Sequence, residues 1–150
     1  MLRRNARRNA RRSAFTLMEL MIVLVIIGVL AAAVVPGLVN RAEKAKVARA
    51  KADISNIATQ VKMFKADNSR YPESLNDLTT KPSYAKDWPE GGYIEKLSQD
   101  PWDNDYILRV PGDNGKDYDV ISYGADNTQG GDGNDADLSY WTMNDKKDSK

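Results

Sequence analysis

Four carboxylates lie close together in a glycine-rich segment near the end of the chain. Segment 124–137, GADNTQGGDGNDAD, contains four glycines and the aspartates Asp126, Asp132, Asp135 and Asp137. Like charges at such short spacing repel one another and disfavour an ordered loop. A calcium ion reverses that effect, because Ca²⁺ binds about six to eight oxygen atoms of carboxylates and carbonyls. The segment is therefore either a calcium-binding loop or a solvated turn.

The spacing excludes the EF-hand type of calcium loop. With Asp126 counted as the first position, Gly131 and Asp137 fall where the EF-hand has its glycine and its last carboxylate. Thr128 and Gly130 occupy the third and fifth positions, where the EF-hand has Asp or Asn. Strands rather than helices are also expected on both sides. A calcium loop of another kind remains possible.

A further carboxylate lies at the start of a long apolar run. Residues 20–35 are sixteen consecutive uncharged, apolar residues, and Glu19 directly precedes them. A helix of ~20 residues spans the ~30 Å hydrocarbon core of a membrane. An ionised carboxylate entering that core costs about 2.5–3.5 kcal/mol unless it finds a partner. We expect Glu19 either to pair with a positive charge or to lie at the level of the lipid headgroups.

The composition argues against an enzyme. The chain has no histidine and no cysteine, so nucleophile–base pairs that use either residue are impossible. A site of two carboxylates would have to be built from the aspartates of one glycine-rich loop. That loop has no apolar wall to raise a carboxylate pKa. The sequence therefore predicts a protein without catalytic activity.

The residues before the apolar run are strongly basic. Six arginines and no acid precede Glu19. A secretory signal peptide has a shorter apolar region, of about 7–15 residues, followed by a small-residue cleavage site; here Asn40, Arg41 and Glu43 follow instead. The positive-inside rule keeps the arginines in the cytoplasm and places residues after about 40 outside it. A nucleic-acid-binding arm is disfavoured, because no aromatic residue lies between the arginines.

The helical pattern continues beyond the apolar run and positions the rest of the chain. An apolar stripe with steps of three and four residues comprises Val47, Ala50, Ile54, Ile57, Val61 and Phe64. It predicts one long helix from about 16 to 67, interrupted at Pro36 and Gly37. The first half, 15–39, suits a membrane or a filament core. The second half suits packing on a globular domain better than a free coiled coil, because the stripe covers fewer than three heptads.

The remainder of the chain predicts a small antiparallel sheet. Strand patterns occupy 106–110, 118–123 and 138–142, and the first two flank a turn at 111–115. The expected fold class is α+β, with a long N-terminal helix and a small C-terminal sheet. The expected organisation is a leader at 1–14, a membrane or filament-core helix at 15–39, a globular domain at 40–143 and a flexible tail at 144–150.

The junction of basic and apolar residues carries a family resemblance. The motif AFTLME at 14–19 resembles the processing signal of type IV pilins and pseudopilins. The resemblance implies that a prepilin peptidase cuts between Ala14 and Phe15 and that Phe15 is then N-methylated. The family usually has glycine at the position of Ala14. Alanine differs from glycine but is also a small residue.

Processing gives Glu19 a partner and changes the charge of the protein. Cleavage creates an ammonium group on Phe15, one helical turn from Glu19. In the family, the glutamate of one subunit recruits the amino terminus of the next, so the resemblance assigns Glu19 and Phe15 to assembly. Removing six arginines and no acid takes the net charge from +1 to −5. An acidic domain argues against nucleic-acid partners.

A second, more specific resemblance covers most of the chain after residue 14. The motifs NSRYP at 68–72, WPEGGYI at 88–94, DPW at 100–102 and SYGAD at 122–126 resemble, in order, the major pseudopilins of the type II secretion system. Segment 73–81 departs from that family. The resemblance implies a type IV pilin-like fold and a subunit that polymerises with itself. Such a filament drives export of folded proteins through the outer membrane.

The same resemblance implies partners, a location and a metal. The partners are minor pseudopilins, the prepilin peptidase and the inner-membrane assembly platform. The location is the bacterial inner membrane, as a single-pass protein with a cytoplasmic N-terminus and a periplasmic domain. The metal is calcium, held by the carboxylates of Asp126, Asp135 and Asp137 and by the backbone carbonyls of Tyr123 and Thr128.

One alternative function remains open within the structural class. A type IV pilin for adhesion, motility or DNA uptake would share the processing signal and the long helix. Many type IV pilins close their C-terminal region with a disulfide, which this chain cannot form because it has no cysteine. The missing cysteine pair and the terminal Asp/Gly loop favour a pseudopilin.

Overall fold

The computed structural model describes residues 15–144, without the side chains of residues 33–38. The predicted leader, 1–14, and residues 145–150 of the predicted tail lie outside the described residues. The chain divides into two compact units, Met1–Asn40 and Arg41–Lys150.

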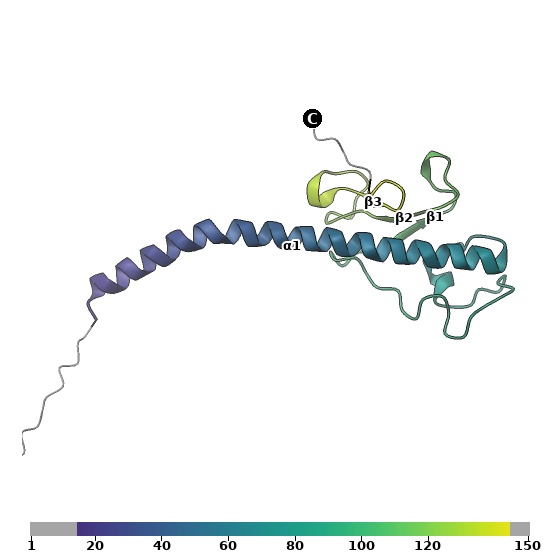
Figure 1. Ribbon diagram of the computed structural model, residues 1–150, viewed down its shortest axis with the longest axis horizontal. Coiled ribbons are helices and arrows are strands. Elements are labelled where there is room, and N and C mark those ends of the chain that lie inside the picture. Colours follow the sequence, from purple (N-terminus) through teal and green to yellow (C-terminus); the bar gives the residue numbers. More distant parts are fainter. Residues whose placement is uncertain (1–14, 145–150) are drawn as a thin grey trace, which may run out of the picture. The chain divides into compact units, whose positions relative to one another are not determined.

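One long helix, α1, runs from Leu17 to Asn68 and has 52 residues (Figure 1). Its ends lie within one residue of the predicted limits. The predicted interruption at Pro36 and Gly37 is wrong, because the helix continues through both residues. Proline removes one backbone N–H, and a helix can lose that single hydrogen bond and continue.

The predicted apolar stripe forms the helix side of the core. Ala50, Ile54, Ile57, Val61 and Phe64 are buried, whereas Val47 at the start of the stripe is only partly buried. Burying a large aliphatic or aromatic side chain contributes about 1.5–3 kcal/mol. This half of the helix is therefore held by packing within its own unit, as the sequence predicts. The other buried apolar side chains of the core are Ala58, Leu75, Leu78, Tyr106, Tyr118, Val120, Leu138 and Met143.

The predicted antiparallel meander is confirmed. Strands β1 (Ile107–Arg109), β2 (Asp119–Ser122) and β3 (Leu138–Ser139) pair in the order β1-β2-β3. Figure 1 shows them on one side of the second half of α1, where the Tyr118 hydroxyl donates to the Ala58 carbonyl at 3.3 Å. The strands are shorter than predicted. After Ser139 the chain turns, because the N–H groups of Thr142 and Met143 both donate to the Ser139 carbonyl.

The end of α1 is fastened to the segment that follows it. Asn68 is 3% exposed, and its side-chain oxygen accepts the N–H groups of Lys86 at 2.7 Å and Asp87 at 3.0 Å. Its amide nitrogen donates to the Phe64 carbonyl and to the Tyr93 hydroxyl, both at 3.1 Å. One buried side chain thus joins the helix to residues about twenty positions further on. A short 3₁₀ helix, η1 (Leu75–Leu78), lies between them.

Candidate functional site

The start of α1 is capped by two residues of the predicted processing motif. The Thr16 hydroxyl accepts the Glu19 N–H at 3.1 Å. In return, the Glu19 carboxylate accepts the Thr16 N–H at 2.9 Å and the Thr16 hydroxyl at 3.0 Å. This reciprocal pair is a capping box, which satisfies backbone N–H groups left without partners at a helix start. Sequence reasoning missed it, although the Thr-x-x-Glu spacing signals it.

The capping box fixes where the Glu19 carboxylate lies. Both partners follow the predicted cleavage point, so cleavage between Ala14 and Phe15 leaves the box intact. Phe15 is 91% exposed, and Ala14 lies outside the described residues. The predicted pairing of Glu19 with a Phe15 ammonium requires a processed chain, so it stays a prediction.

The first half of α1 is apolar on every side, and its described side chains are exposed. Its large apolar side chains keep between 49% and 76% of their surface exposed; they are Leu17, Met18, Leu20, Met21, Ile22, Val23, Leu24, Val25, Ile26, Ile27, Val29 and Leu30. A helix that is apolar all round is normally buried, in a core or in a membrane. This surface therefore requires cover by lipid or by protein.

Within the described residues, no helix combines the length and the apolar character needed to cross a membrane. The predicted membrane helix, 15–39, includes residues 33–38, whose side chains lie outside the described set.

The second candidate site is the loop at 124–137, which is closed at its base. The Ala125 N–H donates to the Asn134 carbonyl at 3.0 Å, and the Asn104 side chain donates to the Gly124 carbonyl at 3.0 Å. A Cβ on Gly124 would lie 2.7 Å from the Asn134 oxygen, and one on Gly131 would lie 2.4 Å from the Asp135 oxygen. Glycine is therefore required where the two sides of the loop meet.

A buried carboxylate supports this loop from beneath. Asp100 is 2% exposed and accepts the Ser122 hydroxyl at 2.6 Å. Its other oxygen accepts the N–H groups of Trp102 at 3.0 Å and Asn104 at 2.9 Å. Asn104 in turn holds Gly124, so Asp100 positions the start of the loop. Sequence reasoning missed this support.

The predicted calcium ligands lie on the same loop but do not gather. The Asp126 carboxylate accepts the Thr128 N–H at 3.0 Å and its hydroxyl at 2.7 Å, and these bonds lower the pKa of Asp126. Asp137 accepts the Gly130 N–H at 3.0 Å. Among the described residues, no three acidic side chains come close enough to hold a metal ion.

The loop therefore fits a calcium ion only in part. Its carboxylates are exposed, apart from the half-buried Asp137. Its side chains are held in hydrogen bonds to the loop itself. The Tyr123 hydroxyl points elsewhere and accepts a hydrogen bond from Arg109 at 2.6 Å. Calcium binding would require the carboxylates of the loop to move closer together.

Comparison with protein families gives two matches. Residues 37–141 match the family "Type II secretion system (T2SS), protein G". Residues 9–35 match the "Prokaryotic N-terminal methylation motif". Together they cover the predicted processing junction, the helix and the sheet.

Individual proteins with the same printed name extend the likeness over most of the chain. The "Type II secretion system core protein G" of Pseudomonas aeruginosa is 46% identical over 133 residues, which are 85% of this chain and 93% of that protein. The corresponding protein of Vibrio cholerae is 45% identical over 136 residues, covering 87% and 92%. That of Escherichia coli is 42% identical over 139 residues, covering 89% and 93%.

A solved structure supports the same fold. The crystal structure of the major pseudopilin from the type 2 secretion system of enterohaemorrhagic Escherichia coli aligns with a TM-score of 0.60 at 33% identity. The alignment covers 71% of this chain and 96% of that one. The predicted pilin-like α+β fold is thereby confirmed.

Proposed function

Because the chain belongs to the protein G family of the type II secretion system, we propose that it polymerises with itself into the filament that drives export of folded proteins through the outer membrane. Membership makes the chain a membrane-anchored structural subunit, a pseudopilin. It also decides against the alternative of a type IV pilin for adhesion, motility or DNA uptake. The observation that carries the proposal is the apolar helix exposed on all sides, joined to a well-packed α+β domain.

The proposal gives each half of the chain a task. Before assembly the first half of α1 anchors the subunit in the inner membrane, in a single pass, with the N-terminus in the cytoplasm and the globular domain in the periplasm. During assembly the same apolar surface leaves the lipid and packs against the helices of other subunits. Apolar surface stays covered throughout, first by lipid and then by protein.

The partners follow from that sequence of steps. A prepilin peptidase removes residues 1–14 and methylates Phe15, an assembly platform in the inner membrane adds subunits, and minor pseudopilins join the filament. Glu19 pairs with the Phe15 ammonium of a neighbouring subunit, which removes an uncompensated charge from apolar surroundings. The protein has no catalytic activity of its own, and the acidic mature domain takes no nucleic acid.

Calcium is the proposed cofactor of the loop at 124–137. Its support is the number of carboxylates, the required glycines at the loop base and the resemblance to the family. Asp126, Asp135 and Asp137 would supply carboxylate oxygens, and Tyr123 and Thr128 would supply backbone carbonyls. The ion would neutralise the mutual repulsion of the aspartates and hold the loop without a disulfide.

Mass spectrometry of membrane-extracted protein tests the processing step. The mature protein should have the mass of residues 15–150 plus one N-methyl group when the prepilin peptidase is present. In a strain that lacks the peptidase, the uncut chain should remain and no filament should form. A product that begins after Ala33, or an uncut chain beside an active peptidase, would contradict the proposed function.

A further inference from the structure

The turn between β1 and β2 contains the only Asn-Gly pair of the sequence, Asn114 and Gly115. Both residues lie in a short 3₁₀ segment, η2 (Asp113–Gly115), and both are exposed. Asn114 has φ 52° and ψ 36°, in the left-handed region that asparagine tolerates in turns. Gly115 follows with φ 74°. These two residues form the tip of the turn.

The base of this turn is fixed, whereas its tip is free. The Gly112 N–H donates to the Lys116 carbonyl at 3.0 Å, and the Lys116 N–H donates to the Asp113 carbonyl at 3.1 Å. A Cβ on Gly112 would lie 2.5 Å from the backbone of Tyr118, but one on Gly115 would meet nothing within 4 Å. Among the residues that the structure describes, no hydrogen bond holds the Gly115 N–H.

A free tip of this composition permits a reaction within the chain. The Gly115 nitrogen can attack the side-chain carbon Cγ of Asn114 and close a succinimide ring. The Cγ–Nδ2 bond breaks, and the proton of the Gly115 N–H leaves with the amide nitrogen as ammonia. Water then opens the ring at either of its carbonyl carbons, which gives aspartate or isoaspartate. Ring closure requires rotation of the backbone at the tip, and a residue without Cβ allows that rotation.

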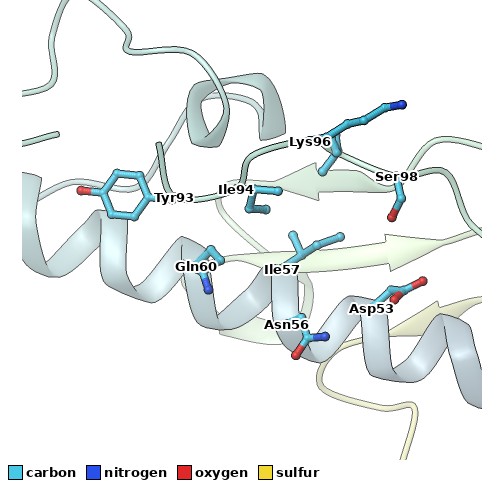
Figure 2. A pocket seen from close by; sticks show the side chains of 9 residues that line it. Asp53, Asn56, Ile57, Gln60, Tyr93, Ile94, Lys96 and Ser98 are labelled. Atoms are coloured by element: carbon cyan, nitrogen blue, oxygen red, sulfur yellow. The ribbon is translucent and has the colours of Figure 1, made fainter. Parts of the chain in front are cut away.

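The other asparagines of the described chain lack this combination. Each is followed by a residue whose side chain crowds the attacking nitrogen; they are Asn40, Asn56, Asn68, Asn76, Asn104, Asn127, Asn134 and Asn144. Asn56 is exposed and lines a hollow of about 270 Å³ on α1 (Figure 2). The nitrogen that it would need belongs to Ile57, inside a helix where each N–H donates to the carbonyl four residues earlier. Exposure alone therefore does not make an asparagine reactive.

We propose that Asn114 is a modification site, at which the folded protein deamidates through a succinimide and becomes a mixture of aspartate and isoaspartate forms. Water is the only co-reactant, and the released ammonia accounts for the lost nitrogen. The reaction requires only the turn between β1 and β2, so the inference stands apart from the proposed filament function and can fail without it.

The two products differ in their effect on the fold. Asn114 lines a hollow of about 500 Å³ together with the cationic Arg109 and Lys116. A new carboxylate there meets positive charge, so the aspartate form should melt at the temperature of the unmodified protein. Isoaspartate lengthens the backbone of the turn by one methylene group and disturbs the bonds that join Gly112, Asp113 and Lys116. The isoaspartate form should therefore melt at a lower temperature.

Peptide mapping by mass spectrometry tests the site on purified full-length protein kept folded in mildly alkaline buffer. The peptide that contains Asn114 should gain the mass difference between an NH₂ and an OH group, and an isoaspartate methyltransferase should label it. Conversion at Asn114 should exceed that at Asn56 by about tenfold or more, because only Asn114 precedes a residue without Cβ. If Asn114 converted in denaturant but stayed intact in the folded protein, the turn would protect it and the inference would be overturned.

Two variants identify the route of the reaction. Asn114→Gln keeps Gly115 and the exposed amide but requires a larger ring, so position 114 should stay unmodified. Gly115→Ala adds a Cβ beside the attacking nitrogen and should suppress conversion of Asn114. Conversion of Asn114 that continues unchanged in Gly115→Ala would refute the succinimide route. Chromatography of aged wild-type protein separates the two products for melting, and Asn114→Asp supplies the reference for the aspartate form.

Discussion

Glu19→Gln is expected to abolish filament assembly and secretion while the protein still enters the membrane. Glutamine at this position preserves the capping box, because its side-chain oxygen can accept the same N–H group from Thr16. It removes the negative charge that would face the Phe15 ammonium of the next subunit. Breaking a buried ion pair by removing one partner costs about 3–5 kcal/mol, which is more than a hundredfold in an assembly constant.

Three measurements make this result interpretable. Membrane fractionation should show Glu19→Gln and Glu19→Ala inserted at least as well as wild type, since both remove a charge from an apolar segment. Electron microscopy should show no filaments, and the secreted protein should stay in the periplasm. The control Thr16→Val removes the hydroxyl of the capping box but keeps the charge, so filaments should still form.

The opposite pattern would assign Glu19 a different role. If Glu19→Gln assembled normally and Thr16→Val did not, the carboxylate would serve only to start the helix. Loss of an N-cap lowers helix stability by about 0.5–2 kcal/mol. This is less than the effect expected from the lost ion pair. The two variants thus distinguish local helix capping from pairing between subunits.

The features that the sequence predicted are those with local or periodic signals. The stripe that includes Ile54, Val61 and Phe64 predicted the buried face of α1, because burial repeats with the period of the helix. The β-branched and aromatic residues of 106–110 and 118–123 predicted strands β1 and β2, because such residues favour extended backbone. Strand β3 ends at Ser139, earlier than predicted, because the turn after it depends on backbone bonds that no side-chain pattern reports.

The features that the sequence did not predict depend on contacts between distant residues. Asp100 holds Ser122 and, through Asn104, Gly124. Asn68 joins the end of α1 to Lys86. A single polar residue in a loop has no periodic pattern that signals burial. Its burial can be recognised only from a structure that shows which distant segments surround it.

Calcium is expected to raise the melting temperature of the fragment 41–150 by on the order of 10 °C relative to chelator. This fragment is the second compact unit of the chain. A ligand that binds only the folded state at ~100 times its dissociation constant stabilises that state by roughly 2.7 kcal/mol. For a domain of this size, each kcal/mol shifts the melting temperature by about 4–8 °C. Magnesium should have much less effect, because it requires tight octahedral geometry and retains its waters.

Asp126→Asn separates the two possible roles of this side chain. Asparagine keeps an oxygen that can accept the Thr128 N–H, so the melting temperature in chelator should change little. It lacks the full negative charge that attracts the ion, so most of the calcium-dependent rise should disappear. The control Asp148→Ala removes a carboxylate outside the loop and should leave the rise intact.

Equal melting temperatures of the wild-type fragment in calcium and in chelator would show that the loop is a solvated turn. The bonds from Thr128 to Asp126 and from Gly130 to Asp137 would then be the final arrangement of these carboxylates. A rise that calcium produces in wild type but not in Asp126→Asn would show instead that the Asp126 carboxylate binds the ion. We expect the calcium-dependent rise, because the four aspartates repel one another in a loop without a cation. A bound calcium ion neutralises that repulsion and is attracted by all four charges.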